Sequence, residues 1–344
     1  MGQRHFSWKK PVWGFAVLVM GSGTLLSQAK QDLIPLRVQL GDASINNVPY
    51  IVAYEEGLYK KNGLHVDQWI SPGAAQVVNL SGAEVPEEYV REESAEITSG
   101  GGTPMMVGRA TNARAGDRVV IATLDCTVRY HIVAREGLQN LEELKGKRLG
   151  FSSVGALTHF VALTFAKRMG WDPVMDISLM SDASSLDALQ KGWVDAFVAF
   201  EIPSAYAHKN GFQRMEDTRT WNVPVAGSGA RASRAWLQND RNREATRRFT
   251  KALLEAIALV KKDREIAFRA MSKWYGIRDR EVQGFIYAGG VDMRRKPYPC
   301  VEGIKKTMEV YDSNEMRKHK PEDFYDDSFV RELDQSGFID SLYK

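Results

Sequence analysis

Several short segments of the sequence place small, hydroxyl-bearing or charged residues directly after an apolar run that is typical of a strand. In an open parallel sheet, ligands bind beyond the carboxyl ends of the strands. These segments are therefore the first candidates for a binding site. They span residues 41–47, 98–104, 126–129, 152–158, 181–185 and 200–203.

A run of three glycines stands out in the segment EITSGGGTPMM. Backbone N–H groups at the start of a helix suit a carboxylate, sulfonate or phosphate, and glycines leave them uncovered. The alternative is a tight turn that glycine merely permits. The segment is not G-x-G-x-x-G and lacks the Gly-Lys-Ser/Thr ending of a phosphate-binding loop, so nucleotide binding loses support. The candidate ligand-binding residues here are Ser99, Gly100, Gly101, Gly102 and Thr103.

A second set of hydroxyl and amide groups lies in the segment SSVGALT, at Ser153, Gly155, Ala156 and Thr158. Capping of their own helix explains any one of these residues equally well. Taken together, they indicate a second wall of the same site.

Charged and amide side chains supply the remaining candidates. Glu201 follows an apolar strand and precedes Pro203, so its carboxylate either faces a cleft or stabilises the positive end of its own helix. Arg129 is suited to neutralising an anionic ligand. Asp42 and Asn47 follow the first strand, although Asp42 is equally suited to closing a turn.

No enzymatic signature accompanies these residues. The sequence has no H-E-x-x-H, no G-x-S-x-G and no paired C-x-x-C, and its histidines are not at metal-ligand spacing. We therefore expect no catalytic residue, no metal and no cofactor. Cys126 is a candidate at the edge of the site, with a small buried hydrophobe as the favoured alternative. The sequence leaves open whether it pairs with Cys300, the other cysteine.

The elements that position these segments alternate between strands and helices. LRVQL, LHVDQWI and RVVIATL are strand-like, and PYIVAYEEGLYKKNG is typical of a helix begun by proline and ended by glycine. The same order restarts at LEELKGKRLGFS and continues through DAFVAF, and from residue 240 the pattern is helical. This predicts an α/β protein with two successive sheets, a cleft between two lobes and C-terminal helices.

The first 29 residues have the pattern of a secretory signal. A basic start precedes an apolar stretch of 16 residues, and SQA offers a cleavage site. A membrane anchor is the alternative, but a spanning helix needs about 20 apolar residues. Removal of the segment takes away Arg4, Lys9 and Lys10, and the net charge of +3 falls to zero. With no basic patch interleaved with aromatics, nucleic acid is not an expected partner.

Four motifs, in order, resemble the nitrate/sulfonate/taurine-type (thiamine-precursor-binding-like) substrate-binding proteins of ABC importers: YIVAYEEGLYKKNGLHV, LEELKGKRLGFSS, LQKGWVDAFVAFEIPSAYA and FYDDSFVRELDQSGFID. The resemblance implies a two-lobe periplasmic binding protein fold of the second type, which closes like a flytrap around its ligand. It implies lobe 1 at residues 30–128 and 229–344 and lobe 2 at 129–228, behind a signal peptide at 1–29. Some relatives resemble pyrimidine-forming enzymes, whose cysteine-rich run is absent here.

The resemblance further implies a periplasmic, monomeric protein that captures a small polar solute and delivers it to an ABC permease in the inner membrane. The expected solutes are a sulfonate, an aromatic or other carboxylate, or a vitamin precursor, and Tyr50, Trp69 or Phe200 is expected to stack on an aromatic portion. An enzyme for a small metabolite on the same fold and an exported ligand sensor are the alternatives.

Overall fold

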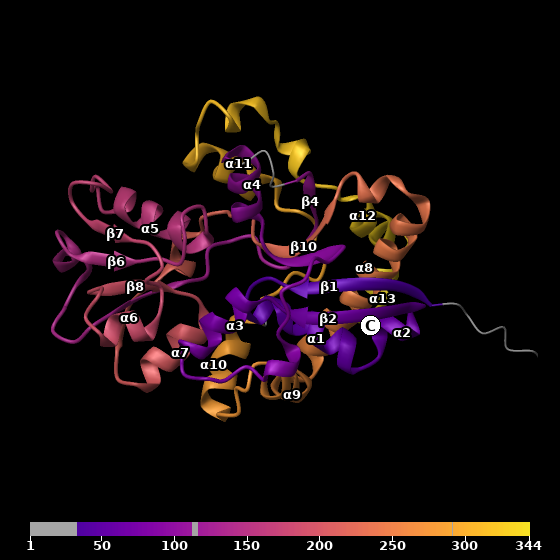
Figure 1. Cartoon of the computed structure of the whole chain (residues 1–344), viewed down its shortest axis with the longest axis horizontal. Coiled ribbons are helices and arrows are strands. Elements are labelled where there is room, and N and C mark those ends of the chain that lie inside the picture. Colours follow the sequence, from indigo (N-terminus) through magenta and orange to yellow (C-terminus); the bar gives the residue numbers. More distant parts are fainter. Residues whose placement is uncertain (1–32, 112–115, 291) are drawn as a thin grey trace, which may run out of the picture. The chain divides into compact units, whose positions relative to one another are not determined.

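The computed structural model describes residues 33–111, 116–290 and 292–344. The signal peptide expected at residues 1–29 lies outside these ranges. Two five-stranded sheets organise the described chain, with strand orders β2-β1-β3-β10-β4 and β7-β6-β8-β5-β9 (Figure 1). The predicted α/β class with C-terminal helices is confirmed.

The first sheet draws its strands from two distant parts of the chain. β1 pairs in parallel with β2 and β3, whereas β10 returns late in the sequence and pairs antiparallel with both β3 and β4. The apolar strand RVVIATL, which forms β4, therefore runs in the same direction as β3, but its hydrogen-bonded neighbour is the antiparallel β10, which lies between the two. The strands are β1 (Ile34–Leu40), β2 (Leu64–Ile70), β3 (Ile97–Gly101), β4 (Arg118–Thr123) and β10 (Ser228–Ser233).

The second sheet is built from the chain between those parts. β6 pairs in parallel with β7 and β8, and β5 pairs antiparallel with β8 and β9. Phe160, Phe165 and Leu149 belong to a core cluster of this sheet, whereas Val133 and Phe197 belong to the larger cluster that also contains residues of the first sheet. The strands are β5 (His131–Ala134), β6 (Arg148–Gly150), β7 (Ser178–Met180), β8 (Ala196–Ala199) and β9 (Gln213–Asp217).

Helices flank both sheets (Figure 1). The helix expected over PYIVAYEEGLYKKNG divides in two, because Gly57 adopts a φ of 67° between the halves. The α-helices before residue 240 are α1 (Val48–Glu55), α2 (Leu58–Lys61), α3 (Pro72–Asn79), α4 (Gly102–Thr111), α5 (Leu157–Arg168), α6 (Leu186–Gln190) and α7 (Glu201–Lys209).

The C-terminal region is helical, as the sequence predicts. Asn239 caps α8 by accepting hydrogen bonds from the amides of Arg241 and Asn242. One stripe of α8, which includes Phe249, Leu253 and Ile257, is fully buried. No helix in the described ranges is long and apolar enough to cross a membrane. The helices are α8 (Asp240–Lys262), α9 (Arg264–Trp274), α10 (Arg280–Gly290), α11 (Val301–Val310), α12 (Ser328–Gln335) and α13 (Phe338–Ser341).

Two segments, residues 124–130 and 222–227, carry the chain between the sheets. They lie antiparallel, with the Val225 amide donating to the Cys126 carbonyl and the Val128 amide to the Val223 carbonyl, both at 3.0 Å. A disulfide joins Cys126 to Cys300, whose Cα atoms are 5.6 Å apart. The pairing that the sequence left open is therefore formed, and it fastens one crossing segment to the C-terminal region.

Candidate functional site

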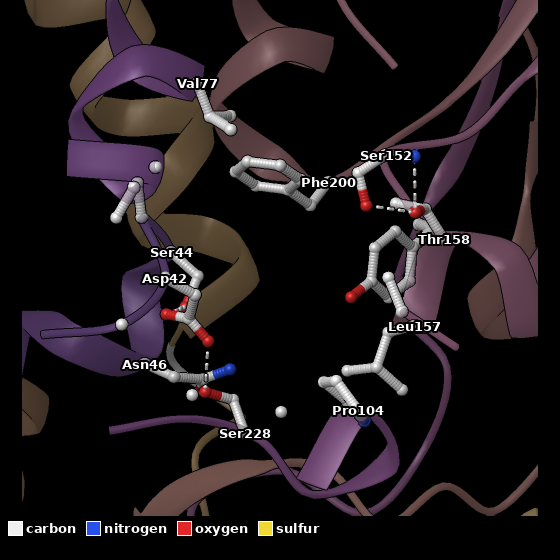
Figure 2. A pocket seen from close by; sticks show the side chains of 18 of the residues that line it. Asp42, Ser44, Asn46, Val77, Pro104, Ser152, Leu157, Thr158, Phe200 and Ser228 are labelled. Atoms are coloured by element: carbon white, nitrogen blue, oxygen red, sulfur yellow. Dashed lines mark hydrogen bonds between the residues drawn. The ribbon is translucent and has the colours of Figure 1, made fainter. Parts of the chain in front are cut away.

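A cavity of about 410 Å³ is lined by residues that follow strands of both sheets, together with residues of the crossing segment 124–130 (Figure 2). Several predicted site residues line it, and the others do not. Those in the lining are Asp42, Gly100, Gly101, Arg129, Ser153, Ala156, Thr158 and Glu201. Those outside it are Asn47, Ser99, Gly102, Thr103, Cys126 and Gly155.

The residues outside the lining are engaged within the protein. The Asn47 side chain donates to the carbonyl and the carboxylate of Asp42. The Thr103 hydroxyl is 3.2 Å from that of Thr307, and Cys126 is in the disulfide. The Gly155 amide donates to Nδ1 of His159 at 3.2 Å. These residues hold the site together rather than face it.

The backbone amides of the glycine run do not form the open anion-binding site that the sequence suggested. Gly100 and Gly101 end strand β3 and pair with Gly229 and Ser228 of β10, while Ser99 is buried in the same pairing. The Gly102 amide donates to the Gly227 carbonyl at 2.6 Å, so the expectation that it is free for a ligand is wrong.

Close packing explains why two of these positions are glycine. Gly100 has a φ of 136°, and a Cβ there would lie 2.7 Å from Nη2 of Arg231. A Cβ on Gly102 would lie 2.2 Å from the Ala226 carbonyl oxygen. A Cβ on Gly101 would instead meet Pro104 and Leu157, at 3.0 and 3.2 Å. Because both of those side chains line the cavity, Gly101 is the glycine that keeps space open there.

The Asp42 carboxylate forms one polar wall. It accepts hydrogen bonds from the hydroxyls of Ser228, at 2.7 Å, and Ser44, at 3.1 Å (Figure 2). Burial raises the pKa of Asp42, and the hydrogen bonds and the nearby Arg231 oppose that rise. Its bonds with Ser44 and Asn47 are the local turn that the sequence offered as an alternative.

A second carboxylate, Asp125, was missed by the sequence analysis. It accepts hydrogen bonds from the Asn46 side chain at 2.9 Å and the Ser228 amide at 2.7 Å. Nη2 of Arg129 lies 3.4 Å from it, and Nη1 of Arg129 donates to the Gly289 carbonyl at 2.7 Å. Arg129 therefore joins the crossing segment to the end of α10, and much of its hydrogen-bonding capacity is used.

Arg231 was also missed, because an arginine in a polar strand ordinarily lies in solvent. It donates to the carbonyls of Ser99, at 2.7 Å, and Gly101, at 3.2 Å. Burial lowers the pKa of Arg231 to about 10, and the charge of Asp42 opposes that fall. Its guanidinium thus fixes the end of β3, and Arg231 itself lines the cavity.

Glu201 differs from the other charged groups. It is the first residue of α7, is 7% exposed and lines the cavity. In the described part of the chain, no other residue donates a hydrogen bond to its carboxylate. Burial raises the pKa of Glu201 to about 7, while the positive charge of Arg129 opposes the rise. Near neutral pH this group is therefore able to donate or to accept a hydrogen bond from a ligand.

The loop after β6 satisfies many of its own polar groups. The hydroxyls of Ser152 and Thr158 are 2.6 Å apart, and the Ser152 amide donates to the Thr158 hydroxyl at 2.9 Å (Figure 2). The Ala156 amide donates to the Ser153 carbonyl at 3.0 Å. The local capping alternative therefore accounts for much of this segment, even though the segment lines the cavity.

Apolar side chains complete the lining. Phe200 projects into the cavity between Val77 and Ser152 (Figure 2), and Leu157 and Pro104 lie along the same space. Tyr50 and Trp69, which we expected to stack on a ligand, are fully buried and do not line the cavity. Of the three aromatic candidates, Phe200 alone is in position to contact a solute.

No group of three or more His, Cys, Asp or Glu side chains that could hold a metal ion occurs within residues 33–111, 116–290 and 292–344. The carboxylates of Asp42 and Asp125 are instead held by serine hydroxyls, asparagine amides and Arg129. The arrangement can bind a solute through polar contacts, with an apolar side chain beside them.

Known structures of the same fold include periplasmic binding proteins and an enzyme. The periplasmic nitrate-binding protein NrtA from Synechocystis PCC 6803 is 14% identical, with a TM-score of 0.67 over 89% of each chain. The periplasmic aliphatic sulphonate binding protein SsuA from Escherichia coli is 19% identical, with a TM-score of 0.60 over 80% of this chain and 85% of its own. The desulfurization enzyme DszB is 12% identical, with a TM-score of 0.58 over 88% of this chain and 99% of its own.

These likenesses establish the predicted two-lobe periplasmic binding protein fold. A search of curated protein sequences finds no match. The model of the family described as NMT1/THI5 like matches residues 44–267, which include most of both sheets and most of the residues that line the cavity. The chain belongs to the NMT1/THI5-like family.

Proposed function

We propose that this protein is the solute-binding component of an ABC-type importer. In this proposal a signal peptide at residues 1–29 directs it to the periplasm. Lobe 1 (residues 30–128 and 229–344) and lobe 2 (residues 129–228) then close on a small polar organic solute, and the closed form presents the solute to a membrane permease. The observation that carries the proposal is Glu201, a buried carboxylate without a donor from another described residue, in the wall of a cavity lined from both sheets.

The charge balance of the cavity supports a particular kind of solute. Asp42, Asp125 and Glu201 are acidic, and the two arginines, Arg129 and Arg231, donate to main-chain carbonyls. Both arginines line the cavity, and Nε of each is buried and has no hydrogen-bond partner among the described residues. A solute with N–H donors therefore gains more here than one with a strongly anionic group, because Glu201 has acceptor capacity to spare.

The proposed orientation follows from the same contacts. The donor-bearing end of the solute lies against Glu201, and a flat apolar part lies against Phe200. The sulfonate and carboxylate solutes expected from the sequence are less well matched to this wall. Their anionic group would need the amides at the start of α5, where Leu157 and Thr158 line the cavity.

Closure by population shift follows from the placement of these groups. Asp42 follows a strand of the first sheet, and Glu201 follows a strand of the second. A solute that contacts both gains more free energy in the closed arrangement than in an open one, and it therefore shifts the population toward closure.

Native mass spectrometry of the gently purified full chain tests the proposal. We expect a small noncovalent adduct, and thermal-shift assays with amines, amino-heterocycles, aromatic carboxylates and sulfonates then identify its class, because a ligand that binds the folded state raises the melting temperature. Glu201→Gln should abolish or strongly weaken the response to donor-bearing solutes. Trp193→Phe, at an exposed position outside the cavity lining, is the matched control and should leave the response unchanged.

An enzyme on the same fold is the second candidate. It draws support from the likeness to DszB and from Glu201, because a carboxyl group with a pKa of about 7 suits general acid or base catalysis. Incubating the protein with each compound that it binds distinguishes the two functions. Recovery of the compound unchanged supports transport, and conversion to a product that is lost in Glu201→Gln supports the enzyme.

A further inference from the structure

The Cys126–Cys300 disulfide lies where the chain crosses between the sheets. The Cys126 carbonyl accepts a hydrogen bond from Val225 of the other crossing segment. Cys300 is the N-terminal cap of α11, and α11 contacts that other segment directly, since a Cβ on Gly303 would lie 1.8 Å from the Val225 carbonyl oxygen. The bond therefore links one crossing segment to the helix that packs against the other.

The positively charged guanidinium of Arg294 lies close to both sulfur atoms. Its Nη1 is 2.9 Å from Sγ of Cys126 and 3.6 Å from Sγ of Cys300. Its side chain is anchored by donation to the Tyr298 carbonyl at 2.5 Å, and its amide donates to the Leu124 carbonyl at 2.9 Å. A guanidinium this close stabilises a thiolate.

The two sulfur atoms differ in environment. Cys300 is 6% exposed and sits at the N-terminus of a ten-residue helix, whose partial positive charge favours a thiolate there. Cys126 is partly exposed. Asp125 is the acidic neighbour, but its carboxylate is engaged by Asn46, Ser228 and Arg129. An incoming thiolate thus reaches Cys126 more easily, and Cys300 is the better leaving group.

We propose that Cys126–Cys300 is a thiol–disulfide exchange site, and that its reduction loosens the crossing between the two lobes. A thiolate from a small thiol or a dithiol reductase attacks Sγ of Cys126, the Cys126–Cys300 bond breaks, and its electron pair leaves on Sγ of Cys300, next to Arg294. A second thiol then releases Cys126 and forms a disulfide in the reductant. Two electrons pass to the protein, and both cysteines end as thiols or thiolates.

Reduction frees α11 and the crossing segment from each other. The hydrogen bonds from Val225 to Cys126 and from Val128 to Val223 then lose a covalent support, so the segments open more often. The inference is independent of which solute the cavity binds, and it would hold even for an enzyme on this fold.

Two measurements on the native full chain test the inference. After brief exposure to reduced glutathione and acid trapping, peptide mass spectrometry should find glutathione predominantly on Cys126. Hydrogen exchange in residues 124–130 and 222–227 should then be faster in dithiothreitol than without it. A disulfide that reacts only after denaturation, equal adducts on both cysteines, or unchanged exchange would overturn the proposal.

Variants at residue 294 separate the chemistry from a purely structural role. Arg294→Gln should slow reduction by about threefold or more, because the leaving thiolate loses its positive neighbour. Arg294→Lys should restore most of the rate. Arg295→Gln is the matched control, since Arg295 lies over the ring of Tyr343 and should leave the rate unchanged. Equal rates in folded wild type, Arg294→Gln and Arg294→Lys would contradict the role given to Arg294.

Discussion

Replacement of Glu201 by glutamine should change how the stability of the protein depends on pH. The carboxylate is buried in the cavity wall, and burial raises its pKa from the ordinary value of 4.5 to about 7. Such a group binds its proton more tightly in the folded state than in the unfolded state. The folded state is therefore favoured at low pH, and this advantage is lost as the pH rises from 4.5 through 7.

The size of the effect follows from the shift in pKa. One pKa unit corresponds to about 1.4 kcal/mol, so the shift of Glu201 removes about 3 kcal/mol of unfolding free energy between pH 4.5 and pH 8. Glutamine has a similar shape and does not titrate. Relative to wild type, Glu201→Gln should therefore gain about 3 kcal/mol of stability over that range, apart from a constant offset. Asp42, whose pKa is also raised, is present in both proteins, so the difference reports Glu201 together with its electrostatic interaction with Asp42.

Urea unfolding at a series of pH values, followed by circular dichroism, measures this difference. Phe200→Leu is a suitable control, because it alters the same cavity without removing a titrating group. Its curve should run parallel to that of wild type. If the curve of Glu201→Gln also runs parallel to wild type from pH 4.5 to 8, Glu201 is not the buried, proton-binding group described above.

Three further variants test other parts of the structure. Gly101→Val should abolish retention of the solute in native mass spectrometry, because the new side chain meets Pro104 and Leu157. Gly73→Ala is the control and should retain the solute, because Gly73 lines the same cavity and its Cβ would have open space around it. Replacing Cys126 and Cys300 together by serine should lower the unfolding free energy, measured by denaturant titration, by about 3 to 5 kcal/mol. The reason is that the disulfide joins residues 174 positions apart and so restricts the unfolded chain. An unchanged unfolding free energy would contradict this. Asp195→Asn should lower the unfolding free energy by about 2 kcal/mol at pH 7, because Arg148 and Arg135 hold the pKa of Asp195 at about 2. The difference in unfolding free energy from wild type should shrink as the pH falls from 4 toward 2. A difference that does not depend on pH would contradict this pairing.

The features that could be predicted from the sequence are those encoded locally. Alternation of apolar strands with helices predicted the two sheets, and the stripe that includes Phe249 and Leu253 predicted α8. Glu201 was placed near a ligand by its position after a strand, and it does line the cavity. The four motifs indicated the family and the fold; the family model confirms the family, and the solved structures confirm the fold.

The features that could not be predicted depend on residues distant in the chain. The glycine run resembled a loop because nothing near it reveals that β10, more than 120 residues later, pairs with its first two glycines. For the same reason Arg231 and Asp125 were missed, since their roles arise only when β10 and the crossing segment come together. Tyr50 and Trp69 have the composition of a stacking site, but tertiary packing places both in the core.

We propose that a small solute binds between the residues that follow β1 and β3 and those that follow β6 and β8. The most direct test is a crystal structure of the full chain carrying the solute that it retains through gentle purification. We expect the solute in the cavity, with an N–H group within hydrogen-bond distance of Glu201 and an apolar face against Phe200. A solute bound elsewhere, or one whose anionic group takes the place next to Glu201, would contradict it.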